Sequence, residues 1–184
     1  MTGRFIAFVG PSGVGKDSVM EALAAHDARF SLARRVITRS SDAGGEVFES
    51  VSNVGFQTRK TAGTFALNWS AHGLHYGIPA EVDETLANGQ DVLANLSRAV
   101  LAQANARFVR FEVVNLTADR AVLARRLTAR GRESAQEIEK RLAHTGATLP
   151  QGLTVHEIDN SGTLTQTMIG VIACLYPVRL QVGM

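Results

Sequence analysis

The sequence predicts an α/β fold with a five-stranded parallel core sheet flanked by helices, and three observations indicate it. Short apolar runs alternate with segments of helical periodicity along most of the 184 residues, which is typical of parallel strands joined by crossover helices. The first apolar run, RFIAFV at 4–9, leads directly into the glycine-rich stretch GPSGVGK at 10–16. A segment rich in Gly, Ser and Thr, at 40–77, interrupts the alternation. We therefore expect one core with a loop-rich insertion.

The first half of the chain is expected to provide two core strands, one helix and the insertion. A buried strand at 4–9 leads through the glycine stretch into a helix from about Lys16 to Ala25, and a short strand follows at 33–38. Within 40–77, the pieces GTFALNWS and LHYGI predict short antiparallel strands around a small helix. This insertion is where a second substrate could be enclosed.

After the insertion the regular alternation returns and completes the core. Pro79 and Gly89 mark the start and the end of the next helix. Helices are expected at 81–89, 98–106, 118–131, 134–144 and 162–176, and strands at 91–96, 107–116 and 153–160. A chain of this length suits a single compact domain. The expected division is a core at 1–39 and 78–184, an insertion at 40–77 and a helical lid at about 126–145.

The composition favours a soluble, cytoplasmic protein that does not bind nucleic acid. The net charge is only +2, and no basic stripe with interleaved aromatic residues is visible. Arginine outnumbers lysine, which favours forked recognition of phosphate or carboxylate groups. The N-terminal apolar run is too short for a signal peptide or a membrane span. Cys174, in the run IGVIACLY, is expected to be a buried core residue. The sequence leaves open whether the protein is a monomer or a homodimer.

The stretch GPSGVGKDSV has the spacing of a phosphate-binding loop, G-x-x-x-x-G-K-[ST]. Its glycines allow consecutive backbone N–H groups to point into one concavity, the next helix presents its positive end, and Lys16 reaches the β- and γ-phosphates. Because the motif follows a buried strand and opens a helix, it predicts a site for a nucleoside triphosphate. The expected nucleotide-binding residues are Gly10, Pro11, Ser12, Gly13, Val14, Gly15, Lys16, Asp17 and Ser18.

Asp17 occupies the position at which this motif usually carries a metal-binding hydroxyl. An acid in the first turn of a helix is favourable with the helix dipole by about 0.3–1 kcal/mol, and Ser18 could then supply the hydroxyl. However, Mg²⁺ prefers oxygen ligands and commonly takes a carboxylate, and the strand at 91–96 ends in Asn95 and Ser97 instead of an acid. Our hypothesis is that Asp17 binds Mg²⁺, with Ser18 as the alternative ligand.

Several arginines surround a glycine turn in RRLTARGRESAQEIEKRL: Arg125, Arg126, Arg130, Arg132 and Arg141. Arginines and glutamates at helical spacing often form only a solvated face. Phosphoryl transfer, however, needs cations around the transferred group, and a helical pair that carries them can close as a lid. Beside a phosphate loop we favour the lid, with Arg130 and Arg141 as catalytic residues together with Lys16.

With these features in place, the chain resembles the guanylate kinase group of P-loop nucleoside monophosphate kinases over nearly its whole length. ITR at 37–39 resembles that family's TTR and implies that Arg39 holds the acceptor phosphate. HYG at 75–77 resembles YYG and implies the same for Tyr76. RLTARGRE and KRL resemble its lid, implying Arg130 and Arg141, and DNSG resembles the loop beside the adenine, implying Asn160.

The chain departs from guanylate kinases where they recognise guanine. Asp42 stands where they have a second arginine, Asn68 stands where a glutamate precedes the Trp, and the acid at the strand end is replaced around Asn95. A site built to hydrogen-bond a base loses selectivity steeply without those partners. GMP is therefore a poor candidate acceptor.

The combination GPSGxGKDS, ITR, FALxWxAHGLxYGI and SRA resembles instead the ribose 1,5-bisphosphate phosphokinase family of phosphonate catabolism. The resemblance implies ATP- and Mg²⁺-dependent phosphorylation of a sugar phosphate at its anomeric phosphate, and makes Asp17 a regular family feature. Besides Arg39 and Tyr76, the residues that could contact the sugar bisphosphate are Asn68, His72, Asn95, Ser97 and Arg98. His72 and His75 could equally be loop residues without a role, and Trp69 is expected to belong to the insertion's own small core.

Two other functions remain open. One is a nucleoside monophosphate kinase, guanylate kinase included, against which the missing guanine contacts argue. The other is a non-catalytic guanylate-kinase-like module that binds a protein partner. Such modules tend to lose the loop lysine and the lid arginines, whereas Lys16, Arg130 and Arg141 are present here.

Overall fold

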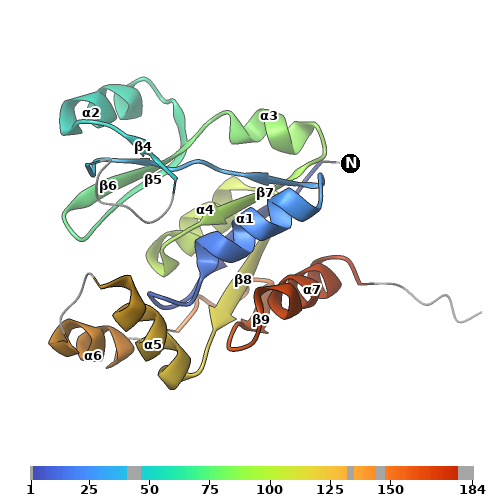
Figure 1. Cartoon of the computed structure of the whole chain (residues 1–184). Helices are drawn as coiled ribbons and strands as arrows, with labels where there is room; N and C mark the ends of the chain where they lie inside the picture. The colour runs from blue at the N-terminus through green and yellow to red at the C-terminus, as the bar shows by residue number, and fades with distance from the viewer. Residues whose placement is uncertain (1, 41–46, 132–134, 144–147, 178–184) are drawn as a thin grey trace, which may run out of the picture.

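The structure is a computed structural model that describes residues 2–40, 47–131, 135–143 and 148–177. A five-stranded sheet forms its centre (Figure 1). In spatial order its strands are β2 (Phe30–Leu32), β7 (Asp91–Asn95), β1 (Phe5–Val9), β8 (Phe111–Thr117) and β9 (Val155–Asp159). All four pairings between neighbours are parallel. The predicted five-stranded parallel core is confirmed.

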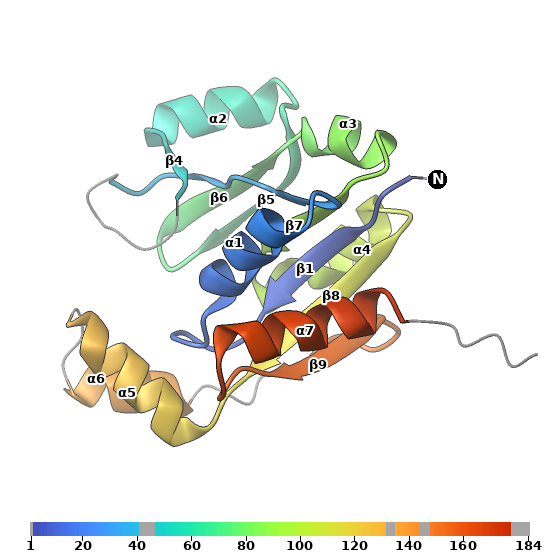
Figure 2. The same ribbon diagram turned by 45° about the vertical axis from the view of Figure 1, so that its right-hand side comes forward.

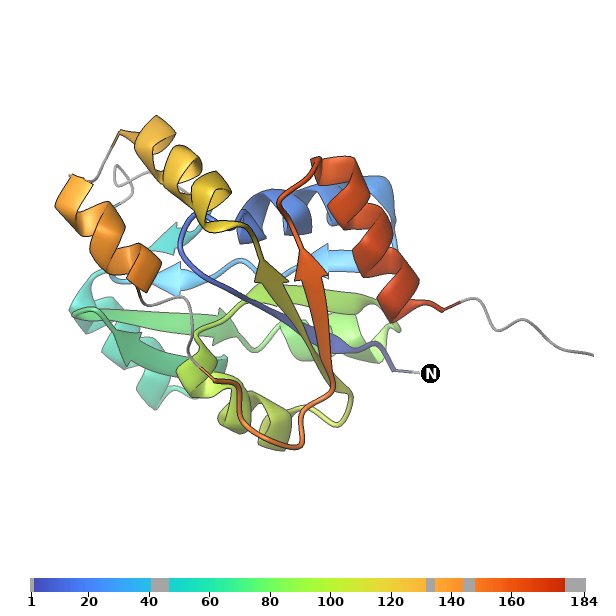
Figure 3. The same cartoon turned by 90° about the horizontal axis from the view of Figure 1, so that it is seen from below.

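Helices cover both faces of the core sheet. The helices are α1 (Lys16–His26), α3 (Val82–Ala87), α4 (Leu101–Arg107), α5 (Arg120–Arg130), α6 (Ala135–Ala143) and α7 (Leu164–Leu175), with a short 3₁₀ helix at Arg98–Val100. Seen from below, α1 and α7 lie on one face and α4 on the other (Figure 3). Side chains alternate between the faces of a strand, so Ile6 and Phe8 pack in one core cluster, and Phe5, Ala7 and Val9 in the other.

The prediction of the second core strand at 33–38 was wrong, because the core strand lies earlier in the chain. The core strand of this region is β2, and Ala33 makes the last bond to the core sheet when its N–H donates to the Leu93 carbonyl (2.9 Å). The apolar pair that suggested a strand forms β3 (Val36–Ile37) of a separate sheet. Val36 and Ile37 are both fully buried, but as part of the small sheet and not of the core sheet. β2 was missed because it has three residues, of which Leu32 is 42% exposed.

The small sheet has the order β4 (Glu49–Ser50), β3, β6 (Leu74–Pro79), β5 (Phe65–Ala71), with α2 (Asn53–Thr61) beside it. The predicted antiparallel strands are the hairpin of β5 and β6. Its two central turn residues, His72 and Gly73, have φ values of 53° and 74°. Positive φ at both positions is the twist-matched turn for a tight hairpin. Phe56 of α2 stacks on Phe65 with ring centroids 4.8 Å apart, which attaches the helix to the sheet.

The closing helix α7 packs through Thr167, Val171 and Leu175, which are spaced four residues apart and buried. Cys174 lies outside this stripe and is exposed, so its predicted burial was wrong. The run IGVIACLY places apolar residues on both the buried and the exposed side of the helix. Apolar character alone therefore does not indicate which side packs against the core. None of the described helices is long and apolar enough to cross a membrane.

A buried ionic cluster fixes the start of β1 to β7, away from the phosphate loop. Arg4 donates to Asp91 from Nε (3.0 Å) and Nη2 (2.5 Å), and Nη1 donates to Glu112 (3.1 Å) and to the Leu175 carbonyl (2.7 Å). Burial alone would lower the pKa of Arg4, but the hydrogen bonds and charge of Asp91 raise that pKa above its ordinary value. The cluster therefore holds a charged guanidinium inside the fold.

Replacing Asp91 by Ala is expected to lower the free energy of unfolding by about 3 kcal/mol, because it leaves the buried Arg4 without its main partner. Urea unfolding would measure this. The matched control is Asp83→Ala, since Asp83 and Arg107 form an ion pair in which both side chains are 43% exposed, and such pairs contribute about 1 kcal/mol or less. Equal losses in the two variants would contradict the structural role of the cluster.

Candidate active site

The phosphate loop lies at the carboxyl end of β1, where the strand order changes direction. From β1 the chain first builds β2 and β7 on one side and later β8 and β9 on the other, and ligands bind at such a switch point in open α/β sheets. Gly10 and Gly15 have φ values of 145° and 95°. A Cβ at Gly10 would lie 2.4 Å from the Leu116 carbonyl oxygen, and one at Gly15 would lie 2.8 Å from Asn160 Nδ2. Only glycine fits these two positions.

Lys16 and the start of α1 provide the positive charge of the loop. The Lys16 ammonium donates to the carbonyl oxygens of Gly10 (3.0 Å) and Pro11 (3.2 Å), so it is held over the loop. Gly15 is the N-cap of α1 and offers no side-chain hydrogen bond. The first-turn N–H groups of such a helix are suited to bind an anion. The geometry is that of a phosphate site.

Two side chains from distant elements hold the carbonyl of Val14. Asn160 is 4% exposed, donates to this oxygen from Nδ2 (2.7 Å) and accepts from the Thr167 hydroxyl (2.6 Å). Arg126 of α5 donates to the same oxygen (3.2 Å). The structure thus puts Asn160 beside the phosphate loop and links the helical pair of α5 and α6 to that loop, while the contact of Asn160 with adenine stays a prediction. Figure 2 shows this pair below α1, next to the loop.

Asp17 and Asn95 meet across the cleft between α1 and β7. Asn95 Nδ2 donates to Asp17 Oδ1 at 2.8 Å, and Asn95 is 9% exposed. In sequence they are 78 residues apart. The residue that replaces the usual hydroxyl is therefore bonded directly to the residue that ends β7 in place of an acid. Ser18, by contrast, is exposed.

A polar cavity of about 380 Å³ opens between the loop, the end of β7 and the small sheet. Its lining includes eight of the predicted residues: Gly10, Lys16, Arg39, His72, Tyr76, Asn95, Ser97 and Arg98. The other lining residues are Arg35, Trp69, Ala71 and Leu96. Four of the lining side chains are cations, and none of the described lining residues is acidic. A cavity of this composition favours a ligand with several negative charges.

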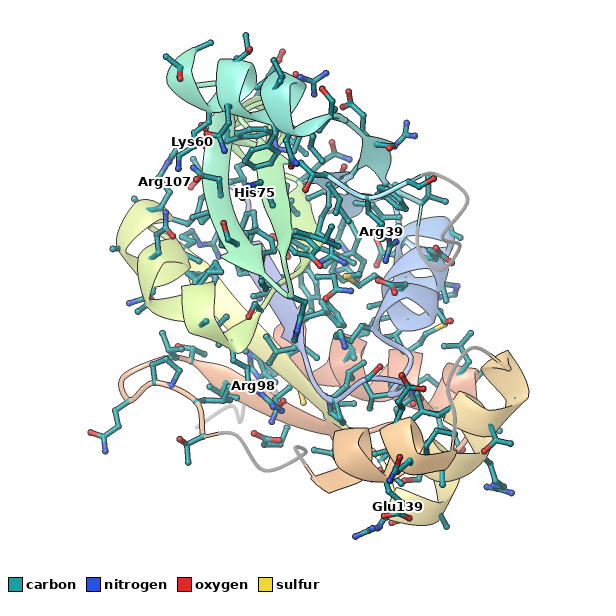
Figure 4. The ribbon with its side chains drawn as sticks, turned by 90° about the vertical axis from the view of Figure 1, so that its left-hand side faces the viewer. Arg39, Lys60, His75, Arg98, Arg107 and Glu139 are labelled. Carbon is teal, nitrogen blue, oxygen red and sulfur yellow. The ribbon has the colours of Figure 1, made fainter. Side chains whose placement is uncertain are left out.

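The cavity's cations come from both sheets. Arg39 follows β3 and stacks over the Phe48 ring at 4.3 Å, and Arg98 follows β7 (Figure 4). Arg98 Nη2 donates weakly to Asn115 Oδ1 (3.4 Å), and its buried Nε has no hydrogen-bond partner among the described residues. An unsatisfied buried donor is costly unless a ligand or water completes it. Arg98 is therefore suited to bind an anionic ligand.

Trp69 and Tyr76 form the aromatic wall of the cavity. Their rings stack with centroids 5.3 Å apart and an interplanar angle of 9°. Trp69 also packs against the core cluster around β1, β7 and β8. Trp69 thus packs against the core of the main sheet and not only within a small core of the insertion, as predicted, and it also faces the cavity.

Some predicted residues do not reach the cavity. Asn68 is not part of its lining and precedes Trp69 on β5, where successive side chains point to opposite faces. His75 pairs with the Ser70 hydroxyl (2.8 Å) and stacks on Phe56 in the small-sheet unit (Figure 4). The backbones of Arg130 and Arg141 belong to α5 and α6, but their side chains, like Asp42 and Arg132, lie outside the described part of the chain.

Arg35 lines the cavity, but the sequence analysis did not single it out. It donates from Nη1 to the Asn95 carbonyl (3.1 Å) and lies 5.4 Å from the centre of the Tyr76 ring. Residues four apart share a face in an extended segment. The four-residue spacing between Arg35 and Arg39 could therefore have indicated that both side chains face the cavity.

This arrangement is the fold of the guanylate-kinase-like P-loop kinases. A guanylate kinase from Anaplasma phagocytophilum superposes with a TM-score of 0.66, covering 98% of this chain and 88% of that one at 15% identity. A gluconokinase from Sinorhizobium meliloti 1021 superposes with a TM-score of 0.55, covering 94% of this chain and 91% of that one at 19% identity. No family model matches the chain.

Sequence relatives identify the family. The chain is 51% identical over 178 residues to the ribose 1,5-bisphosphate phosphokinase PhnN of Ruegeria sp. (strain TM1040), covering 96% of this chain and 94% of the relative. It is 47% identical to the PhnN protein of Pseudomonas fluorescens (strain SBW25), covering 95% and 96%. The chain belongs to the PhnN family of ribose 1,5-bisphosphate phosphokinases and is a kinase. The resemblance inferred from its motifs is confirmed.

Proposed function

We propose that this chain transfers the γ-phosphoryl group of ATP to the 1-phosphate of ribose 1,5-bisphosphate in phosphonate degradation. The product is 5-phospho-α-D-ribose 1-diphosphate. The observation that carries the proposal is the polar cavity beside Lys16, with four cationic side chains and no acid among its described lining residues. An acceptor with two phosphates and no base matches this cavity in charge. The names of the PhnN relatives support the same reaction.

The reaction needs positioning and charge neutralisation rather than a general base. The attacking group is already an anionic phosphate oxygen, and phosphoryl transfer depends mainly on alignment and electrostatic stabilisation. Lys16 binds the β- and γ-phosphates of ATP, and Arg39 and Tyr76 hold the acceptor phosphate that reacts. Arg130 and Arg141 bind the transferred group when α5 and α6 close, in accordance with the family resemblance. The contact between Arg126 and the loop supports the position of this lid.

The residues beside the loop fit a Mg²⁺ ion. Asp17 Oδ1 accepts from Asn95, while Oδ2 has no hydrogen bond to the described residues. Mg²⁺ usually takes one or two carboxylates and completes its shell with phosphates and water. The ion neutralises phosphate charge when it is bound. In our proposal Asp17 holds it, and the Asn95 amide orients Asp17.

The acceptor assignment can be tested with two acceptors in parallel. Release of ADP is expected with ribose 1,5-bisphosphate, and kcat/KM with GMP is expected to be at least about tenfold lower, because the guanine contacts are absent. Phosphorus NMR of the product checks that a diphosphate has formed at the anomeric position. Turnover with GMP alone would refute the sugar assignment. Failure to bind ATP with Mg²⁺ in calorimetry would favour a non-catalytic module.

A further inference from the structure

We infer that Arg35 restricts the acceptor to a sugar bisphosphate. It binds the acceptor phosphate that does not react, and it separates the polar cavity from an adjoining apolar one. The inference rests on the proposed function, because it assigns a residue to one part of that acceptor. Three observations carry it: the position of Arg35 between two cavities, the contacts that fix it, and the distribution of charge around it.

Arg35 stands between two cavities of similar size. The polar cavity of about 380 Å³ contains Lys16, whereas a second cavity of about 390 Å³ lies on the other side of Arg35 and Asn95, which line both. The exposed lining of the second cavity is mainly apolar, with Met20, Leu32 and Leu93, and the charged side chains of Asp17, Glu21 and Arg34 also line it. Arg35 and Asn95 thus form the wall between a space suited to phosphates and a space suited to an apolar or aromatic group.

The Arg35 guanidinium is held in place before any ligand binds. Nη1 donates to the Asn95 carbonyl (3.1 Å), and the group lies over Tyr76, whose ring stacks on Trp69. The Arg35 carbonyl accepts from Glu49 N–H (2.8 Å), and the fully buried Val36 follows it. A guanidinium fixed in this way loses little conformational entropy when it binds a phosphate.

Two of the four cations in the polar cavity, Arg35 and Arg98, remain for the second phosphate. Lys16 belongs to the nucleotide site, and Arg39 belongs to the phosphate that reacts. Arg98 donates to Asn115, which itself donates to both carboxylate oxygens of Glu157 (3.0 and 2.9 Å). Arg98 is thus linked to an acid outside the cavity. Of these two cations, Arg35 is the one that also lines the second cavity, and we therefore assign the second phosphate to it.

The position of Arg35 also explains how acceptors with a base are rejected. The second cavity is the apolar space next to the phosphates, and a nucleobase needs such a space. With Arg35 in the wall, an acceptor held by its phosphate meets a cation where a base would have to pass. The same side chain therefore favours a second phosphate and disfavours a base, which is specificity by attraction and repulsion together.

Arg35→Ala tests both parts of the inference. Binding of ribose 1,5-bisphosphate and of ribose 1-phosphate is measured by calorimetry with a non-hydrolysable ATP analogue, using displacement for the weaker ligand. We expect the variant to weaken binding of the bisphosphate about 30-fold, since a charge-assisted contact is lost, but to weaken binding of ribose 1-phosphate less than about threefold. Relative turnover of GMP against the bisphosphate should rise at least about tenfold. Arg35→Lys should recover part of the bisphosphate affinity.

Arg34→Ala is the matched control, because Arg34 is the exposed neighbour and lines only the apolar cavity. Arg34→Ala should change the affinity for each sugar phosphate and the relative turnover of GMP by less than about threefold. Equal losses for both sugar phosphates in Arg35→Ala, or the same pattern in Arg34→Ala, would overturn the inference. Turnover by the wild-type enzyme distinguishes a failure of the Arg35 inference from a failure of the proposed function. If the wild-type enzyme does not phosphorylate ribose 1,5-bisphosphate, the proposed function itself is wrong.

Discussion

Replacement of Lys16 by Met is expected to lower kcat/KM for ATP about 10³-fold without unfolding the protein. The ammonium is held by the carbonyls of Gly10 and Pro11, directly over the loop that receives the phosphates. A fixed cation at a transferring phosphoryl group acts in a site that excludes water, where removing one such contact costs about 10²–10³-fold or more. Methionine keeps the unbranched apolar part of the side chain and removes the ammonium group with its charge and hydrogen-bond donors. Steady-state kinetics and ATP binding by calorimetry measure the effect.

The matched control for this variant is Lys60→Met. Lys60 is exposed on α2, at the far end of the small-sheet unit (Figure 4). It should keep kcat/KM within about twofold, and thermal unfolding should show that both variants are folded. If Lys16→Met retained activity within threefold of the wild type, the glycine loop would not be the site of the transferred phosphates.

The core sheet could be predicted from sequence because its signals are local. β1 and β7 are buried along their whole length and β8 along most of it, and such runs are recognised as strands without any knowledge of their neighbours. β2 and β3 could not be assigned correctly, because each has at most three residues. Which sheet a short strand joins is decided by pairing with distant residues, and sequence alone does not give that pairing.

The residues of the site also differ in how far the sequence alone could identify them. The glycine loop is contiguous, so its residues were identified as a group. The polar cavity was predicted for the most part, because short motifs mark Arg39, Tyr76 and Arg98. Asn68 and Cys174 depend on which side of a strand or a helix faces the interior, and Arg35 depends on two cavities that meet at one side chain. These properties arise only when distant segments pack together.

Asp17→Asn is expected to lower kcat about 10²–10³-fold and to raise the Mg²⁺ concentration needed for half-maximal activity. The asparagine carbonyl can still accept the hydrogen bond from Asn95, which spans 2.8 Å in the wild type. The variant therefore removes the charge and one metal ligand but keeps the contact between α1 and β7. Asp17→Ser restores the usual hydroxyl of the motif, yet it should also lower turnover, because β7 then offers only Asn95 and no acid.

The alternative reading of Asp17, as a residue that only stabilises the start of α1, predicts a different result. The loss of a dipole interaction would cost about 0.3–1 kcal/mol of stability and leave the metal dependence unchanged. Ser18→Ala is the decisive comparison, because Ser18 is the other candidate ligand. Mn²⁺ binding with a non-hydrolysable ATP analogue, followed by water-proton relaxation, gives a readout that does not depend on turnover. If Ser18→Ala weakened Mn²⁺ binding and Asp17→Asn did not, the metal ligand would be Ser18, and the Asp17–Asn95 pair would serve only to join α1 to the core sheet.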